Sequence, residues 1–139
     1  MSEITIGTSC TLDHVVEDKD CTTRGEHQIF ATPNLVLLVE AAAIEALSQH
    51  LPQGQSSVGS HISISHVAPT LKGQTLRATT TVALVDRRRV VFDVEVHDES
   101  DSVSTGTHER FIVDLDKFGQ RLNAKAAMLA DVGASQRHG

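Results

Sequence analysis

The chain has 139 residues and a formal net charge of −6, and only 3% of its residues are aromatic. A chain of this length builds one hydrophobic core, so we expect a single domain over residues 1–139, with 119–139 as a C-terminal extension that is partly helical or frayed. Negative charge and scarce aromatic rings argue against a nucleic-acid partner, which needs cations for phosphates and rings for stacked bases. The sequence has no bilayer-length apolar run and no secretory signal. Its two cysteines, Cys10 and Cys21, cannot form a disulfide framework, so we expect a cytoplasmic protein with no membrane partner.

A long apolar helix is the strongest predicted element. A weak strand precedes it at residues 7–16, and the helix begins at Thr32, a good N-cap, followed by Pro33, which suits the first helical position. The apolar run continues to Leu47, and a proline and a glycine soon after it end the helix. Because the segment is apolar nearly all round, we expect it to be buried.

Four alternating or β-branched segments follow the helix, at residues 58–68, 75–85, 90–97 and 104–115. Polar breaks between them predict hairpin turns. One helix followed by consecutive antiparallel strands is an α+β pattern. Nothing else in the chain can cover the helix, so we expect it to be wrapped by a curved antiparallel sheet of about five to six strands.

An acid and a histidine occupy positions with predicted apolar surroundings. The neighbours of Glu40 at helical spacings of three and four are all apolar, and an unpaired carboxylate on such a face is costly. The alternative is that Glu40 reaches solvent at the edge of the helix. His66 follows Ile62 and Ile64 on the strand face that meets the helix. A lone inward histidine is more often a satisfied core group, but a glutamate with a histidine forms an acid–base pair near neutral pH.

Thr32 is the third candidate for the same site. Capping the helix would by itself account for this residue, although the N–H groups of a first helical turn also attract negative charge that develops on an oxygen. Thr32 and Glu40 are eight positions apart, which is about 12 Å along a helix axis. One imidazole reaches both only with extended side chains, so we expect a second protomer to complete the site.

Three further features bear on function. Gly59 precedes the strand of His66 and would allow a ligand to approach the backbone closely. The polar run at 106–110, Gly-Thr-His-Glu-Arg, is a water-facing or interface surface with cross-strand ion pairs. The three arginines at 87–89 form either a solvated hairpin tip or a partner for the phosphates of a nucleotide-bearing substrate. The sequence has no phosphate-binding glycine loop, serine nucleophile elbow or His/Cys metal spacing, so no metal is expected.

Several short motifs occur together between about residues 8 and 125. They are Phe-Ala-Thr at 30–32, Glu40 eight residues further on, Val-Gly-Ser and Ile-Ser-His within 58–66, Ala-Pro-Thr at 68–70, and the segments 94–98 and 106–110. Together they resemble the hotdog-fold thioesterase superfamily, and in particular its fluoroacetyl-CoA thioesterase family. The Thr–Glu–His spacing and the last segment are the more specific of these motifs.

This resemblance implies a hotdog fold and hydrolysis of a small acyl-CoA thioester. It places the family's catalytic threonine, glutamate and histidine at Thr32, Glu40 and His66, its substrate-contacting glycine at Gly59, and an arginine near the site at Arg110. It also implies that the protein works without a metal or organic cofactor, as a homodimer or dimer of dimers with sites at the dimer interface.

Two other functions are open on the same fold: a non-catalytic sensor of acyl-CoA or another small ligand, and an enoyl-CoA hydratase or dehydratase. Within the thioesterase hypothesis, Glu40 acts as a general base on water, or as a nucleophile that forms an anhydride. His66 orients or protonates, and Thr32 helps to place the water or the carboxylate. The acyl group, and the choice between CoA and an acyl-carrier protein, are open as well.

Overall fold

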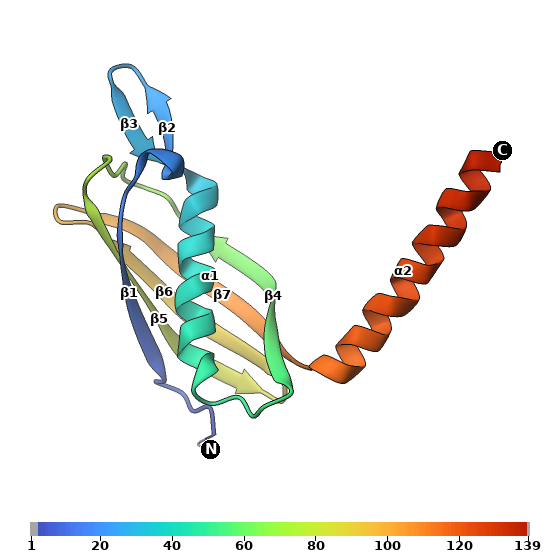
Figure 1. Ribbon diagram of the computed structural model, residues 1–139. Helices are drawn as coiled ribbons and strands as arrows, with labels where there is room; N and C mark the ends of the chain where they lie inside the picture. Colours follow the sequence, from blue (N-terminus) through green and yellow to red (C-terminus); the bar gives the residue numbers. More distant parts are fainter. Residues whose placement is uncertain (1–2, 139) are drawn as a thin grey trace.

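One long helix lies across a curved antiparallel sheet in the computed structural model, which describes residues 3–138, with side chains through residue 133 (Figure 1). The helix is α1 (Thr32–Ser48), and the sheet has five strands in the order β1-β5-β6-β7-β4. These strands are β1 (Ser9–Val15), β4 (Gln55–Ile64), β5 (Thr75–Asp86), β6 (Arg89–His97) and β7 (Ser102–Asp114). Neighbouring strands are antiparallel throughout, so the predicted α+β architecture is confirmed.

A small hairpin that the sequence pattern did not predict precedes α1. It consists of β2 (Cys21–Arg24) and β3 (His27–Phe30), and it follows a single 3-10 turn, η1 (Asp18–Asp20). Gly25 closes the hairpin with a φ of 60°, in the left-handed region that favours glycine. Strands this short and polar lack the alternation of apolar residues on which a strand prediction depends.

The start of α1 differs from the prediction by one residue. The N-cap is Ala31, with extended φ and ψ of −79° and 144°, and not Thr32. Thr32 is therefore the first helical residue and Pro33 the second, where a missing N–H costs no intrahelical hydrogen bond. No side chain caps this helix start, so the Thr32 hydroxyl is available to a partner outside the helix.

One side of α1 packs against the sheet and the other side is open. The seven buried side chains of α1 are Leu35, Leu38, Val39, Ala42, Ala43, Ala46 and Leu47. They join inward-facing strand residues such as Leu76 and Phe92 in two hydrophobic clusters. The prediction of complete burial is wrong for the opposite side, where Leu37 and Ile44 are 63% and 47% exposed. The sheet curves around one side of the helix only, so an apolar stripe stays uncovered in the isolated chain.

The two edge strands of the sheet differ in a way that bears on assembly. β4 has ten residues without a single charged residue or proline, whereas β1 has seven and carries Asp13, which pairs with Arg77. Natural proteins protect free edges with charges, prolines or bulges that prevent pairing with another chain. β4 has one bulge, between Gly59 and His61, and is otherwise a long neutral edge open to a further strand.

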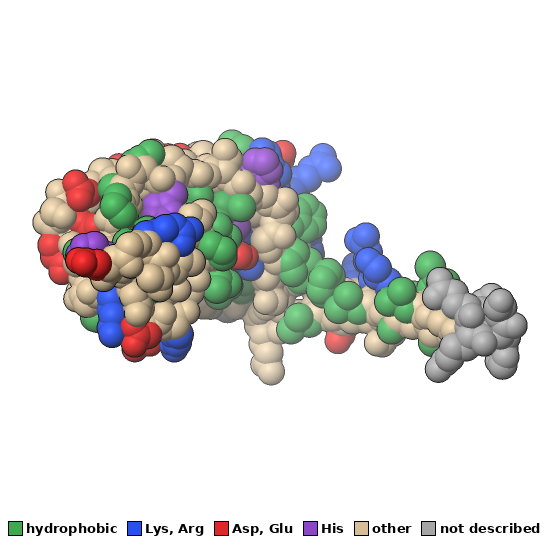
Figure 2. All heavy atoms as spheres, turned by 90° about the horizontal axis from the view of Figure 1, so that it is seen from above, with side chains coloured by type: hydrophobic (Ala, Val, Ile, Leu, Met, Phe, Trp, Pro, Cys, Tyr) green, Lys and Arg blue, Asp and Glu red, His purple; other side chains and the backbone are tan. Residues whose placement is uncertain are grey.

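A second helix, α2 (Leu115–His138), projects from the body of the protein (Figures 1 and 2). It begins before the amphipathic segment expected at 122–132, and Gly119 lies inside it. Three of its larger apolar side chains, Leu122, Met128 and Leu129, are at least half exposed. Among the described residues, neither this helix nor α1 is long and apolar enough to cross a membrane.

Candidate active site

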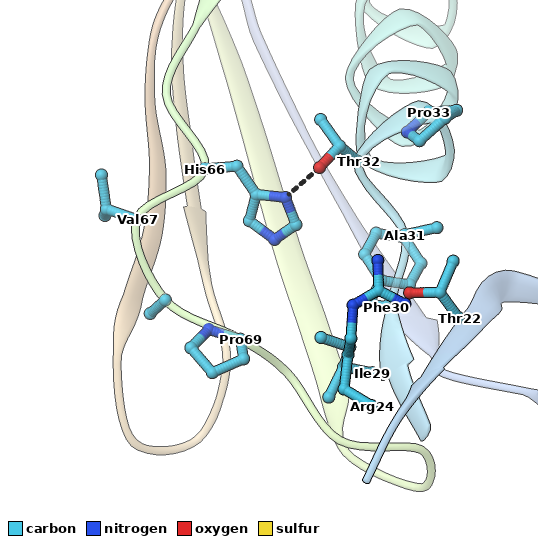
Figure 3. Close-up of a pocket in the computed structure, with 11 residues that line it drawn as sticks. Thr22, Arg24, Ile29, Phe30, Ala31, Thr32, Pro33, His66, Val67 and Pro69 are labelled. Carbon is cyan, nitrogen blue, oxygen red and sulfur yellow. Dashed lines mark hydrogen bonds between the residues drawn. The ribbon is translucent and has the colours of Figure 1, made fainter. Parts of the chain in front are cut away.

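Thr32 and His66 form the first polar cluster, at the N-terminal end of α1. His66 lies just beyond β4, and its Nδ1 is 2.8 Å from the Thr32 hydroxyl oxygen (Figure 3). Burial lowers the pKa of His66, so the imidazole is neutral near pH 7. Its other ring nitrogen, Nε2, is buried and has no hydrogen-bond partner within the described part of the chain. A neutral ring with one nitrogen fixed by a hydroxyl presents the other nitrogen for proton exchange.

This pair borders a cavity of about 410 Å³ between the β2–β3 hairpin and residues 66–69. Figure 3 shows the His66 ring on one side of the cavity and side chains of the hairpin on the other. The walls combine apolar surface, from Ile29, Phe30 and Pro33, with polar side chains of the hairpin and of the Thr–His pair. The cavity is therefore large enough for a small acyl group beside a polar Thr–His pair.

Glu40 and Arg110 form a second cluster further along α1. The Arg110 side chain comes from β7 and is only 3% exposed, and its Nη1 donates to Glu40 Oε2 over 3.3 Å. Its Nε and Nη2 donate to the hydroxyl and the carbonyl oxygen of Ser57, over 2.9 and 3.1 Å. Burial lowers the pKa of Arg110, while Glu40 raises it and favours the charged guanidinium. The arginine is thus held by β4 and aims one N–H at the carboxylate of α1.

His108 supports this arrangement from the same face of β7, two residues before Arg110. It is 2% exposed, and its Nδ1 lies 2.8 Å from the carbonyl oxygen of His61. A carbonyl only accepts, so Nδ1 carries the proton and Nε2 is the acceptor facing Arg110 Nη1 at 3.3 Å. Burial lowers the pKa of His108, and Arg110 lowers it further, so the ring is neutral. The chain of contacts from His61 through His108 and Arg110 orients the carboxylate of Glu40.

Gly59 leaves the space that this carboxylate occupies. It pairs with Arg110 in the β4–β7 register, at the start of the bulge. A Cβ at this position would lie 2.9 Å from Glu40 Oε2 and 3.4 Å from Arg110 Nη1. A cleft of about 280 Å³ opens here, lined by Glu40, Gly59, His61 and His108 among others. A ligand can therefore approach the backbone of Gly59 and the carboxylate together.

Within one protomer the five candidate residues form two groups rather than one site. Thr32 and His66 share the first cluster, and Glu40, Gly59 and Arg110 share the second. The helix fixes the separation, because Thr32 and Glu40 lie eight residues apart on α1, about 12 Å along its axis. Both groups border β4 or the chain just after it, which is the open edge of the sheet.

The polar run at 106–110 has two faces, and only the outward face matches the water-facing prediction. Glu109 faces outward and forms the expected cross-strand ion pair, with Arg89 at 2.6 Å. His108 and Arg110 face inward and are buried, which overturns the water-facing prediction for these two residues. His108 was missed as a functional candidate. Its position two residues from Arg110, and therefore on the same strand face, is the signal that could have identified it.

A long helix wrapped by a curved antiparallel sheet defines the class of hotdog-fold proteins. Residues 13–116 match the model of the fluoroacetyl-CoA-specific thioesterase family. The chain is 36% identical over 98 residues to the fluoroacetyl-CoA thioesterase of Streptantibioticus cattleyicolor, covering 70% of each protein. The chain belongs to this family.

Solved structures agree with the family match. A structure of the fluoroacetyl-CoA thioesterase FlK superposes with a TM-score of 0.82 at 30% identity, covering 89% of this chain and 98% of that one. A Thermus thermophilus protein described as a thioesterase superfamily member superposes with a TM-score of 0.87 at 23% identity, covering 94% and 99% of the two chains, and supports the fold alone. The hotdog fold expected from the sequence motifs is therefore confirmed.

Proposed function

We propose that this protein is an acyl-CoA thioesterase that hydrolyses a small acyl-CoA thioester at a site shared between two protomers. One protomer supplies Thr32 and His66, and the other supplies Glu40, with Gly59 and Arg110 beside the substrate. The observation that supports this most directly is the position of both clusters along β4, whose outer edge is neutral and unpaired in a single chain. Family membership supports thioester hydrolysis as the reaction.

A two-fold axis explains how separated clusters form one site. Two β4 edges can pair as antiparallel strands around a two-fold axis. A residue that precedes the axis in one copy then lies opposite the residue that follows the axis by the same number of positions in the other copy. An axis midway between Gly59 and His66 would bring Glu40 of one copy toward Thr32 and His66 of the other. The uncovered stripe at Leu37 and Ile44 on α1 favours the same kind of assembly, because association would remove it from water.

The residues then have distinct roles in the reaction. Glu40, oriented by Arg110, takes a proton from a water molecule whose oxygen attacks the thioester carbonyl carbon. Backbone N–H groups near Gly59 or at the start of α1 stabilise the negative charge on the carbonyl oxygen. The C–S bond breaks, and the leaving sulfur takes the proton that Glu40 removed from the water. The neutral ring of His66, held at Nδ1 by Thr32, donates a hydrogen bond from Nε2 to the sulfur as its negative charge develops. The products are the free acid and the thiol.

Replacement of Glu40 tests the reaction. A free-thiol assay with short, branched and aromatic acyl-CoAs should show turnover by the parent, and Glu40→Gln should lower kcat by at least about a hundredfold, the usual size of general-base assistance. Glu45→Gln is the matched control, because Glu45 is an exposed carboxylate on the same helix and should leave the rate unchanged. Binding without turnover by the parent would indicate a sensor, and loss of enoyl absorbance would indicate a hydratase.

A further inference from the structure

The cavity beside Thr32 and His66 contains a cationic side chain that the chemistry above does not use. Arg24 ends β2 and lines this cavity together with Thr22, two residues earlier. Alternate residues of a strand share one face, so both polar side chains are turned to the same side of the hairpin. In Figure 3 the side chain of Arg24 lies on the hairpin side of the cavity, beside Phe30, and the His66 ring lies on the other side.

No carboxylate forms an ion pair with Arg24 in the part of the chain that the structure describes. Its Nη1 donates to the carbonyl oxygen of the adjacent Thr23 at 2.8 Å. Arg77, Arg88 and Arg89, in contrast, each have a carboxylate partner within 3.2 Å. None of the residues that line the cavity is acidic. The cavity therefore offers a positive charge without an internal counter-ion.

The backbone that carries Arg24 is tied to the rest of the protein. At the base of the hairpin, the N–H of Phe30 donates to the carbonyl oxygen of Thr70 over 2.9 Å. The N–H of Lys72 donates to the carbonyl oxygen of Gln28 over 3.1 Å, and the Lys72 ammonium pairs with Asp18 at 2.9 Å. The hairpin is thus anchored at its base, and Arg24 lies at its outer end, where it pairs with His27 in the strand register.

The size of the cavity indicates which part of a thioester substrate would meet Arg24. A volume of 410 Å³ corresponds to a sphere on the order of 9 Å across. The thioester carbonyl must lie at Thr32 and His66, in the same cavity. The pantetheine arm of CoA holds its phosphates further than this from the sulfur, whereas the end of a short acyl chain is a few bonds from the carbonyl carbon. An anion beside Arg24 therefore belongs to the acyl group.

We propose that the preferred substrate is a thioester whose short acyl chain ends in a carboxylate, and that Arg24 binds this carboxylate. The proposal rests on the thioesterase function above and specifies its substrate class. Arg24 is exposed on the hairpin, at the open side of the cavity. A carboxylate that enters beside Ile29 and Phe30 loses part of its hydration, and a guanidinium compensates for this loss by pairing with both of its oxygens. Arg24 would not strengthen the binding of an uncharged acyl chain of the same length.

Matched substrates test this directly. Succinyl and butyryl thioesters have acyl chains of equal length and differ in the terminal carboxylate. Each is prepared on CoA and on N-acetylcysteamine, which lacks phosphates. The parent should prefer succinyl on both carriers, and Arg24→Gln should lower the succinyl-to-butyryl ratio of kcat/KM by about tenfold or more on both, with Arg24→Lys in between. Arg87→Gln, at the turn between β5 and β6, is the control and should leave the ratio unchanged.

The other outcomes would overturn the proposal in distinguishable ways. If Arg24→Gln lowers kcat/KM equally for both CoA thioesters and has no effect on the N-acetylcysteamine series, Arg24 binds a CoA phosphate. If the parent hydrolyses butyryl thioesters as well as succinyl ones on both carriers, the thioesterase function stands and the acyl-carboxylate site is wrong. If the parent cleaves no thioester at all, the proposed function fails, and the substrate class fails with it.

Discussion

Mixing two inactive variants tests whether the active site is shared between protomers. Glu40→Gln and His66→Gln each remove one member of the proposed site, so each homodimer should be nearly inactive. In a mixed dimer with composite sites, one site receives both replacements and the other receives neither. The second site has intact Glu40 from one chain and intact Thr32 and His66 from the other, so activity should return.

The size of the recovery follows from the geometry. In the proposed site, Thr32 and Glu40, which lie eight residues apart on α1, about 12 Å along the axis, come from different protomers. Random exchange between equal amounts of the two variants makes half of the dimers mixed, and each mixed dimer has one intact site of two. The mixture should therefore regain about a quarter of the parent's activity per chain.

The assay is thiol release from an acyl-CoA that the parent cleaves, after the variants have been unfolded together and refolded. Thr32→Val mixed with His66→Gln is the control, because both changes fall on the same half of the site and no mixed dimer has an intact site. Differently tagged chains confirm that mixed dimers have formed. Activity that stays at the level of the separate variants, or that recovers equally in the control, would refute the shared site.

Two further predictions concern the cluster around Glu40. Gly59→Ala should lower kcat by about ten- to a hundredfold, because the new Cβ would lie 2.9 Å from Glu40 Oε2 and displace the carboxylate that Arg110 holds. The thermal unfolding midpoint should change little. An unchanged kcat would contradict the position of Glu40 in the active site. His108 has a pKa below its usual value through burial. Protonation of this ring therefore favours the unfolded chain. The free energy of unfolding should be highest above about pH 6.5 and should fall as the pH drops below that value, by up to about 1.4 kcal/mol per pH unit for this group. Urea unfolding between pH 5 and 8 measures this slope, which His108→Gln should reduce; an identical slope in parent and variant would show that another group is responsible.

Local patterns in the sequence were sufficient for the main elements and for the family. The apolar run after Thr32 predicted α1, and alternation predicted the four strands that follow it, because helix and strand periodicities are properties of the chain itself. The same periodicities placed Glu40 on an apolar helix face and His66 on the inward face of the strand predicted at 58–68. In the structure β4 ends at Ile64, and His66 lies just beyond it. The β2–β3 hairpin was missed because its short polar strands have no such pattern.

Spatial relations between distant segments were decided only by the tertiary structure. The Thr32 hydroxyl was predicted to cap its own helix, but strand β4 brings His66 within 2.8 Å of it, across 34 positions of sequence. Arg110 meets Glu40 across 70 positions, because the β4–β7 register sets Arg110 opposite Gly59. Sequence periodicity gives the face on which a residue lies but not the element packed against that face. The partners of each polar group therefore follow from strand order and register, which are properties of the whole fold.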